Sequence, residues 1–284
     1  MVRRGLAAGG LALVGLTAVA AAGGGCGGSA GEPALVFAAA SLADVLTEAA
    51  RELGAGRTDM RFDFNFAGSN VLAQQILSGA PADLFLSADR RQVERLVAAG
   101  AVRADEVTPL AANRLVVVVP SGSRAGELSS PRELLRFRRL ALADPEAVPA
   151  GLYARAWLER EGLWDELAPR VVPALDVRAA LAAVAAGSLE AGVVYASDAR
   201  TGDRVEVVYR VPPERAGPIE YVAAPIADRG GGPAGELLAF LGGPAGRALL
   251  RRHGFEPPGG GGSALGHEAP GDAAHDGPGV SGGG

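Results

Sequence analysis

Two serines stand where this chain could bind an anion at the start of a helix. Ser41 follows an apolar stretch and two alanines, and Ser69 follows Ala67 and Gly68 after a second apolar stretch. The first N–H groups of a helix lack internal partners and the dipole adds about half a positive charge, so an oxyanion can bind there. Each serine alone also fits a plain N-cap, and Asp44 follows Ser41 at the spacing of a capping box.

Residues for other chemistry are scarce. The sequence contains no lysine, which excludes a P-loop lysine, a Schiff base and a lysine general base. His253 is the one histidine in the region that we expect to fold, and it lies in the last turn of the last predicted helix, where a cation favours the dipole. No CxxC or HExxH motif is present, and His267 and His275 lie in a Gly-rich stretch. We therefore expect no catalytic residue, no resident metal and no cofactor.

Charge and length limit the partners and the size of the core. The formal net charge is -5 and the pI is about 5.4, whereas a phosphate backbone requires a basic surface, so we expect no nucleic-acid partner. About 220 residues remain between the two terminal segments, and a chain of this length buries a sufficient core without disulfides or metal.

The first 25 residues are typical of an export signal. Met1 to Arg4 are positively charged, and Leu6 to Ala22 form an apolar run that is short for a membrane span. Small residues then precede Cys26, the only cysteine, as in a bacterial lipoprotein processing site. We predict an exported protein with a lipidated Cys26, held at the outer face of the cytoplasmic membrane or periplasmic. The alternative is ordinary cleavage after Ala22, which leaves Cys26 as a free thiol.

A linker at 26–33 and a disordered Gly-rich tail at 256–284 enclose the body of the chain. In the body, short apolar runs alternate with stretches of helical period, which predicts an α/β fold with parallel strands. We expect strands at 34–38, 61–66, 83–86, 114–119, 139–143, 191–195, 205–209 and 220–225. We expect helices at 42–53, 70–77, 90–99, 150–161, 177–186 and 235–253, the last with a break at 242–244.

Four motifs follow one another in the body at suitable separations. They read FAAASL from Phe37, FAGSNVLAQQILSGAPADLFLSAD from Phe66, DPEAVPAGLYA from Asp144 and DVRAALAAVAAGSLEAGVVY from Asp176. Together they resemble the periplasmic molybdate-binding proteins of ABC importers, the ModA family. The resemblance runs from about residue 34 to residue 255 and implies a type II periplasmic-binding-protein fold, in which two crossover strands form a hinge between two α/β lobes.

The resemblance also implies the domain division and the function. We expect one lobe at 34–112 plus 220–255 and the other at 113–219, with the ligand in the cleft between them. The protein would be a monomeric solute-binding protein that captures molybdate or tungstate and delivers it to a membrane permease, with a lipid anchor as its only contact with the membrane.

Five binding residues follow from the resemblance. Ser41 and Ser69 would offer hydroxyl and backbone N–H groups from the first lobe, Ala150 and Val177 would offer backbone N–H groups from the second, and Tyr195 would add its phenol. Molybdenum would be present only inside the oxyanion, without direct protein ligands. Simple packing is the alternative for Ala150 and Val177, and a hydroxyl bonded to the backbone is the alternative for Tyr195.

Such a shell of donors suits an anion without protons. Molybdate, tungstate and sulfate accept at every oxygen, whereas hydrogen phosphate must donate one proton and requires an acceptor. Sulfate would be discriminated by cavity size, but the triplet Gly68, Ser69, Asn70 has fewer hydroxyls than many relatives, which leaves sulfate as an alternative ligand. An exported hydrolase with Ser41 or Ser69 as nucleophile is a further alternative, which lacks a suitably placed histidine base.

Overall fold

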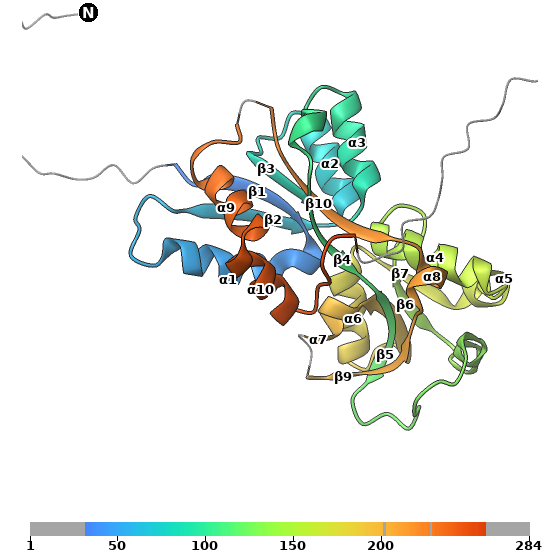
Figure 1. Cartoon of the computed structure of the whole chain (residues 1–284). Helices are drawn as coiled ribbons and strands as arrows, with labels where there is room; N and C mark the ends of the chain where they lie inside the picture. Colours follow the sequence, from blue (N-terminus) through green and yellow to red (C-terminus); the bar gives the residue numbers. More distant parts are fainter. Residues whose placement is uncertain (1–31, 201–202, 228, 260–284) are drawn as a thin grey trace, which may run out of the picture. The chain divides into compact units, whose positions relative to one another are not determined.

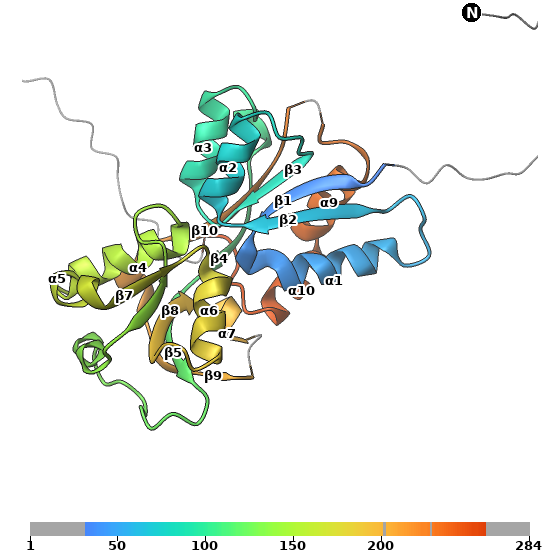
Figure 2. The same cartoon turned by 180° about the vertical axis from the view of Figure 1, so that it is seen from behind.

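Strands and helices alternate along the chain and build two five-stranded sheets (Figures 1 and 2). The computed structural model describes residues 32–200, 203–227 and 229–259. The first sheet has the strand order β2-β1-β3-β10-β4 and the second has the order β7-β6-β8-β5-β9. The strands of the first sheet are β1 (Ala34–Ala39), β2 (Phe62–Ala67), β3 (Leu84–Ser87), β4 (Thr108–Asn113) and β10 (Ile219–Pro225). Those of the second are β5 (Leu115–Pro120), β6 (Leu140–Ala143), β7 (Val171–Ala174), β8 (Ala191–Tyr195) and β9 (Val205–Arg210).

The α/β class is confirmed, but the expectation of parallel strands was wrong in part because both sheets are mixed. β1 is parallel to β2 and β3, and β6 is parallel to β7 and β8. β10 is antiparallel to both of its neighbours, and so is β5. Each reversed strand is the one that arrives from the other sheet: β5 follows β4 directly, and β10 follows β9 through one short helix. Neither arrives through a crossover helix packed on its own sheet, the connection that keeps successive strands parallel.

Helices cover both faces of the first sheet, and α4 and α6 pack on the second. The longer helices are α1 (Ala43–Gly54), α2 (Ser69–Leu77), α3 (Arg90–Ala98), α4 (Pro149–Arg160), α6 (Val177–Ala185), α9 (Gly232–Gly242) and α10 (Pro244–Arg252). Three helices of about one turn, which were not predicted, are α5 (Trp164–Leu167), α7 (Ala196–Arg200) and α8 (Pro213–Ala216).

The central strands of the first sheet are buried on both faces. In β1, Val36 belongs to the cluster that contains residues of α1, α9 and α10, whereas Phe37 belongs to the cluster that contains residues of α2 and α3. Leu84 and Phe85 divide in the same way in β3. Successive side chains of a strand point to opposite faces, so a strand covered on both sides appears in the sequence as a continuous apolar run.

The two strands that were not predicted share one physical cause. β4 contains Pro109 and β7 contains Pro173, and each of these strands lies at the edge of its sheet. Proline cannot donate a ladder hydrogen bond, which makes it rare in central strands and tolerable in edge strands. A pattern search for central strands therefore passes over both segments.

Part of the predicted chain organisation lies outside the described residues. These parts are the export signal, Cys26, most of the 26–33 linker and residues 260–284 of the tail. Glu256, where the tail was predicted to begin, exchanges backbone hydrogen bonds with Ala112 of β4 (2.8 and 2.9 Å). Among the helices of the described ranges, none combines the length and apolar character needed to cross a bilayer.

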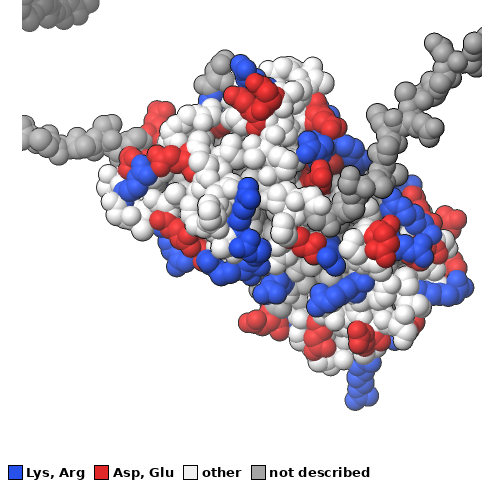
Figure 3. All heavy atoms as spheres, viewed as in Figure 1, with Lys and Arg blue, Asp and Glu red and all other residues white. Residues whose placement is uncertain are grey.

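Acidic and basic side chains are interspersed on the face shown in Figure 3, with white patches between them. Charged side chains also form pairs along or between elements, such as Arg155 with Glu159 within α4 and Arg57 with Glu236 of α9.

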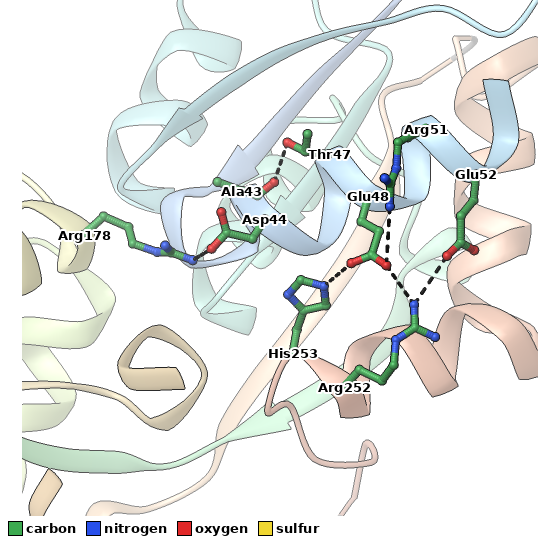
Figure 4. A network of polar contacts seen from close by, with 9 residues as sticks. All are labelled: Ala43, Asp44, Thr47, Glu48, Arg51, Glu52, Arg178, Arg252 and His253. Carbon is green, nitrogen blue, oxygen red and sulfur yellow. Dashed lines mark hydrogen bonds and ion pairs between the residues drawn. The ribbon is translucent and has the colours of Figure 1, made fainter. Parts of the chain in front are cut away.

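His253 joins the end of α10 to α1 (Figure 4). Its Nε2 lies 2.7 Å from Oε2 of Glu48, and the Nη2 of Arg252 donates to Oε1 of the same carboxylate at 2.9 Å. The hydrogen bonds from His253 and Arg252 lower the pKa of Glu48 below its ordinary value of 4.5. His253 thus has a structural partner in addition to the helix dipole.

We predict that Glu48→Gln lowers the melting temperature near neutral pH and that the difference from wild type disappears in acid. A carboxylate whose folded-state pKa is lowered stabilises the fold above its unfolded-state pKa, and this stabilisation is lost as the pH falls below 4.5 and through the lowered value. Thermal unfolding of both proteins across this range measures the effect. A difference that stays constant down to strongly acid pH would contradict the ionic contact.

Gly151 allows the start of α4 to lie against the end of β6. A Cβ at this position would lie closer than 3.0 Å to the carbonyl oxygens of Ala143 and Asp144, which real Cβ atoms essentially never do. Ala150 directly precedes this glycine, so the same close approach holds the first turn of α4 against the carboxyl end of β6.

We predict that Gly151→Ala lowers the free energy of unfolding by about 1 to 3 kcal/mol, because the added methyl group overpacks a backbone contact. This loss exceeds the gain of up to about 1 kcal/mol that alanine brings to a helix. Gly242→Ala, at the end of α9, is the matched control, since a Cβ there meets no atom within 4 Å. Urea unfolding measures the free energy of unfolding of both variants. Equal changes in the two would contradict the close approach at Gly151.

Candidate oxyanion-binding site

The five residues expected to bind the ligand line one cavity. The wall is formed by Ala39, Ala40, Ser41, Ala67, Gly68, Ser69, Ala88, Val148, Pro149, Ala150, Asp176, Val177 and Tyr195. These residues lie at or just beyond the carboxyl ends of the parallel strands β1, β2, β3, β6, β7 and β8, where open α/β sheets bind their ligands. Both sheets therefore contribute to one site.

Four helices begin at this cavity. α2 begins with Ser69, α4 with Pro149 and α6 with Val177, and α1 follows a 3-10 turn that contains Ser41. The N-caps of α1, α2 and α4 make no side-chain capping hydrogen bond, while Asp176 caps α6 by accepting from the N–H of Ala179 at 2.9 Å. Converging helix starts direct free backbone N–H groups and the positive ends of their dipoles at the cavity, whose wall contains no cationic side chain.

Neither serine is a helix cap, and the capping box expected for Ser41 and Asp44 is absent. Ser41 Oγ lies 2.8 Å from the phenol oxygen of Tyr221, and Asp44 pairs with Arg178 instead. Ser69 is the first residue of α2 rather than its N-cap, and its Oγ accepts from the N–H of Ala88 at 3.1 Å. Both hydroxyls are thus committed to contacts beside the cavity instead of to their own helix starts.

Tyr195 ends β8 with its side chain fully buried in the cavity wall. The phenol oxygen has no hydrogen-bond partner, although a buried hydroxyl without one costs about 1 to 3 kcal/mol. Burial raises the pKa of the Tyr195 phenol well above its ordinary value, so the group keeps its proton and remains a donor. The bond to backbone that was the alternative for this residue is not present.

Arg178 follows Val177 directly, but its charge is neutralised outside the cavity wall. Its Nη2 lies 2.7 Å from Oδ2 of Asp44 in α1, and its Nε lies 2.5 Å from Oδ1 of the buried Asp198 in α7. Figure 4 shows the first of these pairs reaching between α6 and α1. This guanidinium therefore links a helix of the second sheet to a helix of the first, and the cavity is left to uncharged donors and the capping Asp176.

The cavity is small and its walls are mostly Ala, Gly, Val and Pro. The space that it offers to a water-sized probe is about 20 Å³, far below the roughly 300 to 1,000 Å³ of pockets for organic ligands. Within the ranges that the structure describes, no group of three His, Cys, Asp or Glu side chains could hold a metal ion. The site therefore has room for a compact ion rather than for a sugar or a peptide.

Two further residues support the cavity wall from behind, and the sequence analysis did not predict them. Tyr221 in β10 and Asn113 at the end of β4 are both buried, and the Nδ2 of Asn113 donates to the Tyr221 oxygen at 3.2 Å and to Ser197 Oγ at 2.8 Å. A tyrosine inside an otherwise apolar strand was the only sign of this network in the sequence. Ser41, Asn113 and Tyr221 lie far apart along the chain, so no local pattern connects them.

Comparisons with known proteins agree with this geometry. Residues 34–256 match the family described as bacterial extracellular solute-binding protein. The molybdate-binding protein ModA of Escherichia coli K12 is 38% identical over 229 residues, which cover 78% of this chain and 87% of that protein.

A second relative and a solved structure extend the likeness. The putative ABC transporter substrate-binding lipoprotein YvgL of Bacillus subtilis is 34% identical over 68% of this chain and 74% of that protein. The substrate-binding domain of a putative molybdenum ABC transporter from Clostridium difficile is 29% identical and has a TM-score of 0.62, with 79% of this chain and 98% of that one covered.

The unpartnered phenol predicts an asymmetry between two buried tyrosines. Without an oxyanion, Tyr195→Phe should leave the free energy of unfolding unchanged or raise it by about 1 kcal/mol, since it removes an unsatisfied buried hydroxyl. Tyr221→Phe should lower it by about 1 to 3 kcal/mol because it removes contacts to Ser41 and Asn113. Urea unfolding measures both, and an equal loss in the two variants would mean that Tyr195 has a structural partner.

Proposed function

The chain belongs to the bacterial extracellular solute-binding proteins, and from that membership we propose that its cavity captures molybdate or tungstate for delivery to the permease of an ABC importer. The observation that carries the proposal is the buried phenol of Tyr195, which keeps its proton, lacks a partner and lines the same wall as the starts of α2, α4 and α6. A donor in that position is satisfied when an anion enters.

The binding residues of the proposal are Ser41, Ser69, Ala150, Val177 and Tyr195. The two hydroxyls, the phenol and the backbone N–H groups at the helix starts would surround the oxyanion with donors. Dipoles and neutral donors then replace the ion's hydration shell, so no cation has to be desolvated along with it. The small volume of the cavity supports a tetrahedral anion rather than a larger solute.

We further propose that each sheet with its helices forms one lobe, with the division at 34–112 plus 220–255 and 113–219. The chain passes between the sheets at the β4–β5 and β9–β10 connections, which would serve as the hinge. We also propose that the protein acts as a monomer.

From the sequence of the first 26 residues we also propose that the protein is exported and attached to the membrane through a lipid on Cys26. Family membership supports an exported protein, and the Bacillus subtilis relative named as a lipoprotein supports lipidation of Cys26. Mass spectrometry of the mature N-terminus tests the anchor, and a first peptide that begins with unmodified Gly23 would contradict it.

Catalysis is not part of the proposal. The relatives are named as binding proteins of transporters. No histidine of the described ranges lines the cavity, because His253 lies at the end of α10 against Glu48, so neither serine has an imidazole base there.

We predict one-to-one binding of molybdate and tungstate, with sulfate much weaker, in titration calorimetry of the mature protein. Ser41→Ala and Tyr195→Phe should each weaken molybdate binding by about 1 to 3 kcal/mol, which is about 5- to 150-fold in Kd, because each leaves a charged acceptor without a donor. Tyr209→Phe, which removes a phenol oxygen from β9 outside the cavity wall, is the matched control and should bind as wild type does.

Each contrary outcome addresses a different part of the proposal. Wild-type affinity in both Ser41→Ala and Tyr195→Phe would contradict the site. Sulfate binding as tight as molybdate binding would contradict the ligand, and absence of heat with all the oxyanions would contradict the function.

A further inference from the structure

An ion pair joins the two sides of the cavity. The Nη2 of Arg178 in α6 lies 2.7 Å from Oδ2 of Asp44 in α1, and Figure 4 shows this contact reaching from one helix to the other. Asp44 lies in the first turn of α1, three residues after Ser41, and Arg178 directly follows Val177. Each partner is therefore close in sequence to a residue of the cavity wall, on opposite sheets.

The position of Asp44 is unfavourable for a residue that contacts an anion. Neither Asp44 nor Arg178 belongs to the described cavity wall. A carboxylate three residues from Ser41 would by itself repel an oxyanion bound there. The guanidinium offsets this charge only while α1 and α6 lie close together. The pair therefore acts on the arrangement of the two sheets rather than on the ligand directly.

Asp198 holds the Arg178 side chain ready for this contact. Asp198 in α7 is fully buried, and its Oδ1 lies 2.5 Å from the Nε of Arg178. Because α6 and α7 pack against each other, this second contact stays on the second sheet. An arginine normally loses rotamer entropy when it forms a surface ion pair, which is one reason why such pairs contribute little. Here Asp198 already fixes the side chain, so the contact with Asp44 does not bear that cost.

The pair is also partly shielded from water. The side chain of Arg178 is 26% exposed and that of Asp44 is 44% exposed, whereas Arg103 and Asp105, a surface pair, are 63% and 70% exposed. Salt and water screen a partly buried pair less than an exposed one. We therefore expect the bridge between α6 and α1 to contribute more than an ordinary surface pair.

An anion in the cavity can leave only when the two sheets move apart. The five proposed binding residues come from elements of both sheets, and none of them is more than 4% exposed. An anion that contacts all five is enclosed from both sides. Its exit requires α1 and α2 to move away from α4 and α6, and this movement separates Asp44 from Arg178.

We propose that the Asp44–Arg178 bridge is a latch across the cavity, which forms when the two walls close on an oxyanion and slows its release. The inference rests on the proposed function and on the proposed division into two lobes. Asp44, Arg178 and Asp198 are positioning residues, since none of them lines the cavity.

The test is the rate at which the mature protein releases molybdate. Protein loaded with radiolabelled molybdate is mixed with an excess of unlabelled molybdate, and rapid filtration follows the bound label over time. The association rate constant is measured separately from binding of the label at increasing protein concentration. The variants change Asp44 and keep Arg178, because loss of the guanidinium would take a cation away from the buried Asp198.

Asp44→Asn should raise the release rate constant about three- to tenfold without lowering the association rate constant. The direction of the effect separates a latch from simple electrostatics. Removal of a negative charge close to an anion site, acting through charge alone, strengthens binding and slows release. Asp44→Glu keeps the carboxylate and should restore most of the slow release.

Glu52→Gln is the matched control. It removes one carboxylate from the same helix, but Glu52 pairs with Arg252 of α10, which packs against α1, so this pair does not cross the cavity. This variant should release molybdate at the wild-type rate.

The possible failures are distinguishable. Release from Asp44→Asn at the wild-type rate or slower, or equally fast release from Glu52→Gln, would overturn the latch and leave the proposed function intact. Absence of molybdate binding in the wild-type protein would overturn the proposed function and the latch with it.

Discussion

A cavity that takes a doubly charged anion into a protein interior must replace the lost hydration with donors fixed in advance. In the proposed oxyanion site, the donors would come from the starts of α1, α2, α4 and α6 and from three hydroxyls, while Arg178, which follows Val177, is held by Asp44 and Asp198. Each helix start reaches the cavity because its helix follows a strand whose carboxyl end points there. The order of the strands in both sheets serves this one requirement.

One hydroxyl group in the cavity wall has no hydrogen-bond partner in the structure. The oxygen of Tyr195 is buried without a partner, whereas the neighbouring Tyr221, in edge-to-face contact at 6.0 Å between ring centroids, has two. Two tyrosines in nearly the same environment thus have opposite roles. The hydroxyl of Tyr221 bonds within the fold, whereas the hydroxyl of Tyr195 lies unpaired in the cavity wall, where the proposed anion would accept from it.

Contacts between elements of the two sheets converge on the same place. Asn113 of β4 bonds to Ser197 of α7, and Asp44 of α1 pairs with Arg178 of α6. Both contacts lie close in sequence to cavity residues, since Arg178 follows Val177 and α7 follows Tyr195. The groups that hold the two sheets together are therefore next in sequence to residues of the cavity wall, so the geometry of the cavity depends on the arrangement of both sheets.

The sequence by itself determined the α/β class, most of the strands and helices, and the five residues that meet at the cavity, because apolar periodicity and four ordered motifs are local properties of the chain. It failed at β4 and β7, where Pro109 and Pro173 are tolerated only because these strands lie at sheet edges, and at Ser41, whose spacing to Asp44 suggested a cap. Only the tertiary structure decided what Ser41 bonds to. Its partner Tyr221 is 180 residues away along the chain, and Asn113, which donates to Tyr221, is 72 residues away, so only the folded chain brings these groups together.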